Sequence, residues 1–349
     1  MTAVQGGNGD LVVVGGGKMG LSHLAIASQI VGKANIVLCD TSWAQRRLIG
    51  SFGYRVAPSL AALLAGGRAV AGVIISTPTP SHFAIAAQVL ARGIPCFIEK
   101  PLTLDPRASE RLTARQGDPA RHQMGLVLRY VASFLHLRTL VQGGSLGPVH
   151  HYSALMAGNV ITAPGGDGWR SDFSRGGGCL NEYGPHLFDL CRFIFGEVET
   201  LGAAEAGYVH STRADDRMHL DWTHSNGVTG ALQLDWCDLT QRKSLIRFDV
   251  HLQHGRIEAD NAQVTVTLPD DAPLSAQERA AMQALVVPLP VSLYLRGEEY
   301  TLQLEAFLGA IAGRNAHVGA VPHNIAARLD DGLAVDRLID MTARRSGLK

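Results

Sequence analysis

The chain has 349 residues, of which 46% are hydrophobic, and this length exceeds what one hydrophobic core usually serves, so we expect two domains. Its 31 Lys and Arg residues balance its 31 Asp and Glu residues, which leaves no net field to steer a nucleic acid or an anionic membrane. No apolar run approaches the roughly 18 residues of a membrane span, so the composition favours a soluble protein that acts on a small molecule.

The first predicted elements are a strand, a tight turn and a helix. Residues 11–14, LVVV, form a β-branched run, and LSHLAIASQIVG has the spacing of an amphipathic helix that stops at Gly32. The turn between them has the pattern GxGxxG. In a dinucleotide-binding unit the first glycine permits the turn, the second lets backbone approach a pyrophosphate, and the third lets helix and strand pack closely. We expect this turn to contact a cofactor through Gly15, Gly17, Lys18, Met19 and Gly20.

A second predicted strand, NIVLCD, ends at Asp40, which falls 20 positions after Gly20. A carboxylate at this place accepts hydrogen bonds from the adenosine ribose of a dinucleotide. It would repel a 2′-phosphate, so the sequence favours NAD. Arg46 and Arg47 leave NADP open, because arginine is the residue that accommodates that phosphate.

Strands and helices keep alternating through the first third of the chain. Helix-like segments at 59–65 and 83–93 alternate with strand-like segments at 71–76 and 95–101. Such alternation predicts parallel strands in a doubly wound Rossmann sheet, whose ligand lies beyond the carboxyl ends of the strands. Polar residues that follow the last two strands are therefore expected at the cofactor, namely Ser76, Thr77, Pro78, His82 and Glu99.

The pattern changes in the second half of the chain. Strand-like segments with partial alternation follow one another at 149–158, 201–211, 218–225, 228–236 and 244–252. They predict an α+β domain with a large, mostly antiparallel sheet, one face of which packs on helices while the other is available for self-association. We expect residues 1–122 to form the cofactor domain and residues 123–349 to form the domain for substrate binding and oligomerisation.

The stretch GGGCLNEYGPHLFDL (176–190) places an acid and a histidine just before an apolar helix. This helix is expected to begin within 181–185, because Pro185 is tolerated only in a first turn. Glu182 and His186 then lie at its N-terminus, where the helix dipole favours a carboxylate and disfavours a protonated imidazole. A neutral His186 is a base able to take a hydroxyl proton. The pair lacks an evident third metal ligand, so no metal is expected.

Four motifs, taken in order, resemble those of the Gfo/Idh/MocA oxidoreductases, the glucose–fructose oxidoreductase and inositol 2-dehydrogenase family. They are GGGKMGLSH (15–23), STPTPSH (76–82), EKP (99–101) and GGGCLNEYGPH (176–186). The resemblance runs from about residue 11 to the predicted C-terminal helix at 331–345. It implies a Rossmann domain followed by an α+β domain, and nicotinamide-dependent chemistry at a carbon that bears a hydroxyl or a ketone, usually on a sugar or cyclitol.

The resemblance also implies site residues. Lys100 of EKP would lie at the nicotinamide and substrate, and Glu182 and His186 match the acid and histidine of the family pattern GGGxxxDxGxH. The family usually has aspartate where this chain has Glu182, whose carboxylate reaches one methylene further. Substrate contacts are expected from an aromatic face and fixed donors of the kind that hold sugar hydroxyls or a phosphate. These contacts are assigned to Arg129, Trp169, Arg170 and Tyr183.

We therefore expect an NAD-dependent sugar oxidoreductase, with NADP left open, in which Lys100, His186 and Glu182 are catalytic. Two alternatives remain: a redox-neutral enzyme of the same family that uses bound NAD transiently, and a cofactor-binding sensor without chemistry. The resemblance implies a homodimer or homotetramer. Five cysteines without a CxxC pair, and an N-terminus without the features of a signal peptide, predict a cytoplasmic protein.

Overall fold

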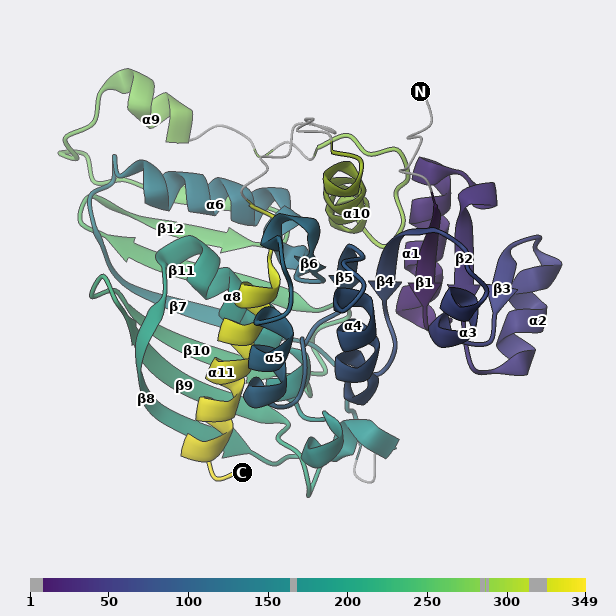
Figure 1. Cartoon of the computed structure of the whole chain (residues 1–349). Helices are drawn as coiled ribbons and strands as arrows, with labels where there is room; N and C mark the ends of the chain where they lie inside the picture. Colours follow the sequence, from purple (N-terminus) through teal and green to yellow (C-terminus); the bar gives the residue numbers. More distant parts are fainter. Residues whose placement is uncertain (1–8, 164–167, 283–285, 287–288, 314–324) are drawn as a thin grey trace. The chain divides into compact units, whose positions relative to one another are not determined.

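The computed structural model describes residues 9–163, 168–282, 286, 289–313 and 325–349 (Figure 1). Its internal contacts divide the chain into two compact units. The first unit combines Met1–Tyr130 with Leu289–Asp336, and the second combines Val131–Pro288 with Arg337–Lys349.

The first unit contains a six-stranded sheet in the order β3-β2-β1-β4-β5-β6, and all of its strand pairs are parallel. This arrangement confirms the predicted Rossmann sheet. The central strands are buried on both faces, as expected for a parallel sheet covered by helices. The strands are β1 (Asp10–Val14), β2 (Ile36–Cys39), β3 (Arg55–Ala57), β4 (Val70–Ile75), β5 (Cys96–Ile98) and β6 (Gln123–Met124).

Helices alternate with the strands, and several of them begin or end at a recognisable signal. Gly32 ends the first helix with a φ of +82°, and Ser59 caps the third by accepting a hydrogen bond from the Ala62 backbone N–H. The helices of this part are α1 (Lys18–Val31), α2 (Trp43–Ser51), α3 (Leu60–Ala65), α4 (His82–Leu90) and α5 (Pro106–Thr113).

A segment from the C-terminal part of the chain completes the first unit. The helix α10 (Glu298–Ile311) buries Leu304, Phe307 and Leu308 in the same apolar cluster as residues of β1, β4 and β5. Helix α11 (Leu329–Arg345) begins in this unit and ends in the other. The division therefore differs from the single boundary expected at 122/123, because β6 extends the Rossmann sheet and α10 covers one of its faces.

The second unit contains a seven-stranded sheet in the order β13-β12-β11-β7-β10-β9-β8. Its pairs are antiparallel except for β7 with β10, which confirms the predicted mixed, mostly antiparallel sheet. The strands are β7 (Val149–Ala157), β8 (Val198–Gly207), β9 (Arg217–His224), β10 (Thr229–Asp235), β11 (Leu245–Leu252), β12 (Gly255–Asp260) and β13 (Val264–Thr267).

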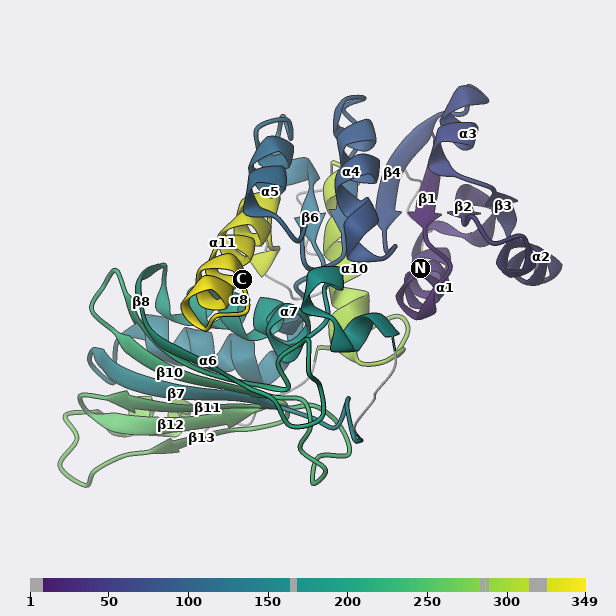
Figure 2. The ribbon, with the colours of Figure 1, turned by 90° about the horizontal axis from the view of Figure 1, so that it is seen from below.

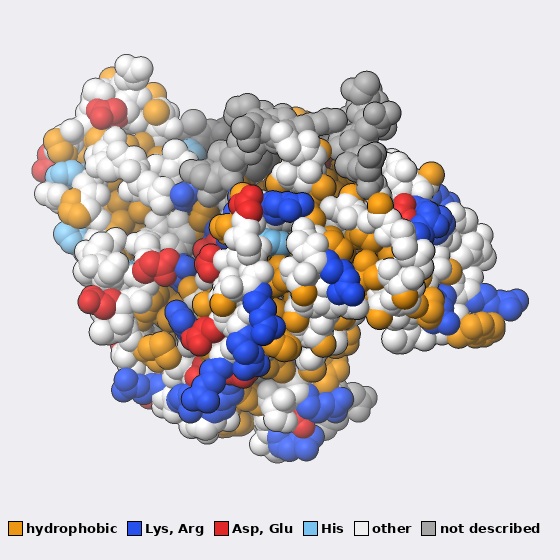
Figure 3. Space-filling view, in the orientation of Figure 1, with side chains coloured by type: hydrophobic (Ala, Val, Ile, Leu, Met, Phe, Trp, Pro, Cys, Tyr) orange, Lys and Arg blue, Asp and Glu red, His pale blue; other side chains and the backbone are white. Residues whose placement is uncertain are grey.

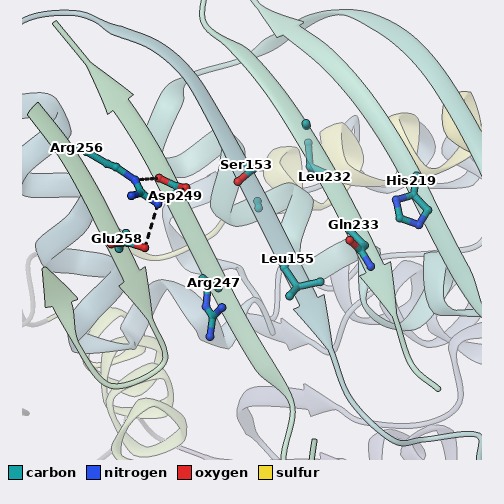
Figure 4. A pocket seen from close by; sticks show the side chains of 11 residues that line it. Ser153, Leu155, His219, Leu232, Gln233, Arg247, Asp249, Arg256 and Glu258 are labelled. Carbon is teal, nitrogen blue, oxygen red and sulfur yellow. Dashed lines mark hydrogen bonds and ion pairs between the residues drawn. The ribbon is translucent and has the colours of Figure 1, made fainter. Parts of the chain in front are cut away.

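The two faces of this sheet differ in polarity. Tyr152, Ala154 and Met156 of β7 are buried, and helices α6 (Ala132–Gly143) and α8 (Gly184–Phe195) lie along one face (Figure 2). The opposite face has a shallow hollow of about 420 Å³ (Figure 4). In it Arg256 donates to Asp249 at 2.6 Å and to Glu258 at 3.1 Å. One face packed on helices and one face open to solvent are typical of an antiparallel sheet.

Charges of both signs lie close together on the surface over the C-terminal part of α11 (Figure 3). There Asp340 accepts hydrogen bonds from Arg344 and from Lys349, each at 2.8 Å. Among the helices that the structure describes, none combines the length and the apolarity that a bilayer crossing requires.

Candidate functional site

The glycine turn after β1 has the geometry that its spacing predicts. Gly15 has a φ of +101°, and a Cβ placed there would lie 2.8 Å from the carbonyl oxygen of Ser76. A Cβ on Gly20 would collide with the carbonyl of Gly15, so this glycine lets α1 pack against the turn. Gly17 is exposed and has no atom within 4 Å of the position of a Cβ. Of the three glycines, Gly17 therefore leaves open space for a ligand.

Helix α1 begins directly after this open position. Gly17 is its N-cap and provides no side chain to cap the first backbone N–H groups. The first turn, which contains Lys18 and Met19, carries no acidic residue. An uncapped helix N-terminus beside an open glycine favours an anion such as a pyrophosphate.

Asp40 lies at the end of β2 and is held beside the glycine turn. Its Oδ2 accepts a hydrogen bond from the Gly16 backbone N–H at 2.6 Å, and its Oδ1 accepts one from Ser42 N–H at 2.7 Å. Arg46 donates to the carbonyl oxygens of Asp40 and Thr41, at 2.7 and 2.9 Å. Asp40 is therefore placed for a ribose diol, and Arg46 is engaged with backbone near it; both features fit NAD.

The loop after β4 carries three of the predicted cofactor residues, Ser76, Thr77 and Pro78. The Ser76 hydroxyl donates to the carbonyl of Val14 at 3.2 Å, and the Thr77 hydroxyl accepts from Ser81 at 2.7 Å. These bonds hold the loop close to the glycine turn at the carboxyl end of the sheet. The prediction that the loop contacts the cofactor is consistent with this placement.

His82 was expected at the cofactor, but its ring is buried and bonded to backbone. Its Nε2 lies 2.9 Å from the carbonyl oxygen of Thr77, and its Nδ1 lies 3.0 Å from that of Pro101. Burial lowers the pKa of His82, although both carbonyls favour the protonated ring. The ring therefore joins two loops of the first unit and presents no nitrogen to a ligand.

Glu99 also turns inward. Its Oε1 lies 2.6 Å from Nε2 of His23, whose side chain is 0% exposed, and its Oε2 accepts from the Lys100 backbone N–H at 3.3 Å. Burial alone would raise the pKa of Glu99, but the contacts with His23 and the charge of Lys100 hold it below its ordinary value. Both carboxylate oxygens of Glu99 thus have partners within the protein, and its contact with the cofactor stays a prediction that these contacts do not favour. Lys100 itself is half-buried at the carboxyl end of β5.

Arg129 was expected to bind substrate. In the structure it is buried, and its guanidinium lies 2.9 Å from the carboxylate of Asp331 at the start of α11. A guanidinium that is enclosed with a carboxylate partner serves the packing of the first unit. Substrate binding by Arg129 stays a prediction that these contacts do not favour.

The glycine triplet of the second unit approaches the chain's own backbone and side chains. Gly176 has a φ of +88°, and a Cβ on Gly177 would collide with the carbonyl oxygens of Trp169 and Arg170. Gly178 has a φ of +95°, and its Cβ would collide with Oδ1 of Asp215. The triplet is therefore required for close packing around the turn that leads to Glu182 and His186.

Glu182 and His186 lie on consecutive helical turns. Glu182 ends the short helix α7 (Cys179–Glu182), and His186 is the third residue of α8, which has Pro185 in its first turn, as predicted. Both side chains are half-buried. Tyr183, between the two helices, is buried, and its hydroxyl lies 3.2 Å from that of Ser244. Burial raises the pKa of Tyr183.

Two adjacent acidic residues that no sequence motif marks accept hydrogen bonds in the second unit, and one of them, Asp215, holds the turn before Glu182. Asp215 Oδ2 accepts hydrogen bonds from Leu180 N–H at 2.8 Å and from the Cys179 thiol at 3.0 Å. Asp216 Oδ2 accepts from the backbone N–H groups of residues 209–211, and its Oδ1 accepts from Trp236 at 3.0 Å. These aspartates lie between two predicted strands, and the partners of Asp215 lie 35 and 36 positions earlier, where local sequence does not reveal them. The backbone donors to Asp216 lie five to seven positions earlier, but no motif marks this contact.

Trp169 and Arg170 lie in an exposed single turn, and the Arg170 guanidinium stacks over the Trp169 ring at 4.7 Å from its centroid. An exposed aromatic face beside fixed donors suits a polyhydroxylated ligand. Within the described part of the chain, no group of three His, Cys, Asp or Glu side chains is arranged to hold a metal ion.

Two protein-family models match successive parts of the chain. Residues 10–117 match the oxidoreductase family with an NAD-binding Rossmann fold, and residues 134–258 match the GFO/IDH/MocA C-terminal domain. The chain belongs to the GFO/IDH/MocA family of oxidoreductases. It is accordingly an NAD-binding enzyme, and the glycine turn, the α1 N-terminus and Asp40 are residues that fit this cofactor.

Named members of the GFO/IDH/MocA family are distant in sequence. The chain is 25% identical to inositol 2-dehydrogenase of Rhizobium meliloti (strain 1021), over 95% of each chain. It is 25% identical to the rhizopine catabolism protein MocA of Rhizobium meliloti, over 64% of this chain and 70% of that protein. The solved structure of levoglucosan dehydrogenase with NADH shares the fold, with a TM-score of 0.79 at 18% identity, over 98% of this chain and 97% of that one.

Proposed function

We propose that this protein is an NAD-dependent dehydrogenase or reductase that acts on a hydroxyl or keto carbon of a sugar, cyclitol or nucleotide-sugar. The observation that carries the proposal is the open Gly17 at the N-terminus of α1, with Asp40 bonded beside it, in a chain of the GFO/IDH/MocA family. The names inositol 2-dehydrogenase and levoglucosan dehydrogenase support a polyhydroxylated substrate. NADP remains the second choice of cofactor.

We propose distinct roles for three side chains. Bound NAD supplies the hydride acceptor. Lys100 donates a hydrogen bond to the reacting oxygen and stabilises the negative charge that develops there. His186 accepts the hydroxyl proton as a general base and returns it in the opposite direction. Glu182, one helical turn before His186, orients the substrate or the imidazole.

We further propose that Trp169, Arg170 and Tyr183 contact the substrate, and that two or four copies associate through the exposed face of the seven-stranded sheet. That face places small side chains, Ser153 and Ala231, beside charges of both signs, so a second copy related by a twofold axis would meet complementary groups. All five cysteines are free and buried, which supports a cytoplasmic location.

The test is to incubate purified protein with NAD or NADP and a panel of sugars, cyclitols and nucleotide-sugars while following reduced-nicotinamide absorbance. The reverse reaction is followed with the corresponding ketones. We expect turnover with one cofactor and one substrate class. Lys100→Ala and His186→Ala should lower kcat by at least about 100-fold while cofactor binding stays near normal, because each removes a group that acts at the reacting oxygen. Full activity in either variant contradicts the role assigned to that residue.

Two further outcomes of the same assay identify the alternatives. Protein that releases NAD on denaturation yet shows no net reduction in either direction, while converting a substrate, is a redox-neutral enzyme. Protein that binds NAD but converts no member of the panel fits a sensor.

A further inference from the structure

Lys100 lies between two residues that are each held by a buried histidine. On one side the Glu99 carboxylate lies 2.6 Å from Nε2 of His23, which is 0% exposed. On the other side the Pro101 carbonyl oxygen lies 3.0 Å from Nδ1 of His82, which is 1% exposed. Neither ring is accessible to a substrate, and each ring contacts a residue next to Lys100 in the chain.

The contact between His23 and Glu99 has a defined direction. His23 Nδ1 is buried without a hydrogen-bond partner among the described residues, so a proton on that nitrogen would be left unsatisfied. Nε2 is therefore the nitrogen that donates to Glu99. The other oxygen of Glu99 accepts from the Lys100 backbone N–H at 3.3 Å, and a Cβ on Gly125 would lie 2.8 Å from it. The carboxylate is thus enclosed, with one oxygen on His23 and the other on the backbone of Lys100.

The same histidines connect the backbone around Lys100 to two other predicted cofactor segments, the helix α1 and the loop after β4. His23 belongs to α1, the helix whose N-terminus follows Gly17, and its ring packs edge-on against Phe97 of β5 at 5.2 Å between centroids. His82 bonds the carbonyl of Thr77 at 2.9 Å, in the loop after the neighbouring strand β4. A shift of α1 or of this loop would therefore be transmitted to the backbone on either side of Lys100.

We propose that His23, acting through Glu99, and His82, acting through Pro101, are positioning residues that set the direction of the Lys100 ammonium. The inference rests on the proposed function, in which Lys100 contacts the reacting oxygen. Removal of His23 alone leaves the buried Glu99 carboxylate without this partner, which costs stability. Turnover and the orientation of Lys100 are therefore measured at a temperature at which each variant is folded.

The kinetic test compares His23→Leu, which removes the donor, with His23→Gln, which returns an N–H to the same space. We expect kcat of His23→Leu to fall about 100-fold, the order expected for a misplacement of about 1 Å, while the KM for NAD changes less than about threefold. The kcat of His23→Gln should be at least about tenfold higher than that of His23→Leu, because glutamine can again donate to Glu99. His82→Leu should lower kcat in the same way. Wild-type kcat in both leucine variants would overturn the proposal.

A second readout needs neither substrate nor activity. The chain has five lysines, so reductive ¹³C-methylation yields a spectrum with few lysine signals, and Lys100→Arg assigns the one from Lys100. We expect the Lys100 signal to move in His23→Leu and to return toward its wild-type position in His23→Gln. The signals of Lys18, Lys33, Lys243 and Lys349 should stay in place. An unchanged Lys100 signal in a folded His23→Leu protein would overturn the proposal.

The two readouts separate this inference from the proposed function. Loss of activity in Lys100→Ala, with full activity and an unmoved signal in the histidine variants, rejects the positioning role and leaves the function standing. Full activity in Lys100→Ala rejects the function of Lys100, while the NMR signal still reports whether His23 holds it. Should His23→Leu fail to fold, Glu99→Gln tests the same link, because it keeps the shape and removes the charge. An unmoved Lys100 signal and wild-type kcat in Glu99→Gln would then overturn the proposal.

Discussion

Gly17 and Gly20 lie three residues apart in the same turn, but only Gly17 has room for a side chain. A Cβ on Gly17 meets no atom within 4 Å, and its φ of −70° suits any residue, whereas a Cβ on Gly20 collides with the Gly15 carbonyl. Gly17→Ala should therefore keep its melting temperature and lose NAD affinity by at least about tenfold, about 1.4 kcal/mol. Gly20→Ala should lower the free energy of unfolding by about 1–3 kcal/mol or more.

Calorimetry for NAD affinity and thermal unfolding for stability check this pair. Each variant serves as the control for the other, since both add one methyl group to the same loop. Equal NAD affinity in Gly17→Ala and wild type would mean that the pyrophosphate does not approach this glycine.

Asp215 should make the stability of the second unit depend on pH. Burial raises its pKa from 3.8 to about 6, although Cys179 and Leu180 donate to it. Because the pKa is higher in the folded state, the protonated form stabilises the fold, and this contribution is lost as the pH rises from about 4 to about 6. For a buried group the effect is on the order of 3 kcal/mol.

The measurement is the free energy of unfolding by urea between pH 4 and pH 8, for wild type and Asp215→Asn. The wild type should lose stability relative to Asp215→Asn as the pH rises through this window. Asp216→Asn is the matched control. Burial alone would raise the pKa of Asp216, but its backbone N–H donors hold it below its ordinary value, so its contribution is lost only at a pH below this window. The stability difference between wild type and Asp216→Asn should therefore stay constant from pH 4 to pH 8. A pH-independent difference for Asp215→Asn would contradict the assignment.

Among the elements, α10 packs against the Rossmann sheet although it lies far from that sheet in the sequence. It lies more than 170 residues after the last strand of the Rossmann sheet, yet Phe307 is 1% exposed within a cluster that includes Leu11, Val13 and Phe97. Phe307→Ala should lower the free energy of unfolding of the first unit by about 3–5 kcal/mol, because it removes a large side chain from a packed core.

Chemical unfolding followed through NAD binding measures this loss in the unit concerned. Phe52→Ala is the matched control, since Phe52 belongs to the same unit but is 62% exposed, and it should change stability by less than about 0.5 kcal/mol. Equal stability of the two variants would show that the Rossmann sheet does not depend on α10.

At the scale of the whole molecule, the exposed sheet face predicts the oligomeric state. Ala231 points out from β10 near the centre of that face, so Ala231→Arg should leave folding intact and block close approach of a second copy. Sedimentation velocity should show the wild type as a dimer or tetramer and Ala231→Arg as a smaller species. Ala61→Arg, an exposed position on α3 in the other unit, should sediment as wild type. A monomeric wild type at micromolar concentration would reject this interface.

The sequence by itself determined the features that depend on local order along the chain. Hydrophobic periodicity predicted the strands β1, β2, β4 and β5 and the helices α1, α3 and α4, whereas α2 and β3 were not predicted. The glycine spacing and Asp40 predicted a dinucleotide turn, because the turn, the uncapped helix start and the carboxylate are all set within thirty residues. Pro185 and Gly196 marked the limits of α8 for the same reason.

Only the tertiary structure decided which polar residues of the predicted site face inward. His82, Glu99 and Arg129 stand in motifs at strand ends, yet their partners are Pro101, His23 and Asp331, and two of these lie 76 or more residues away. A buried polar group must find a hydrogen-bond partner, and local sequence does not reveal a partner that the fold brings from elsewhere. For the same reason Asp215, and the return of α10 to the Rossmann sheet, became visible only when distant segments were packed together.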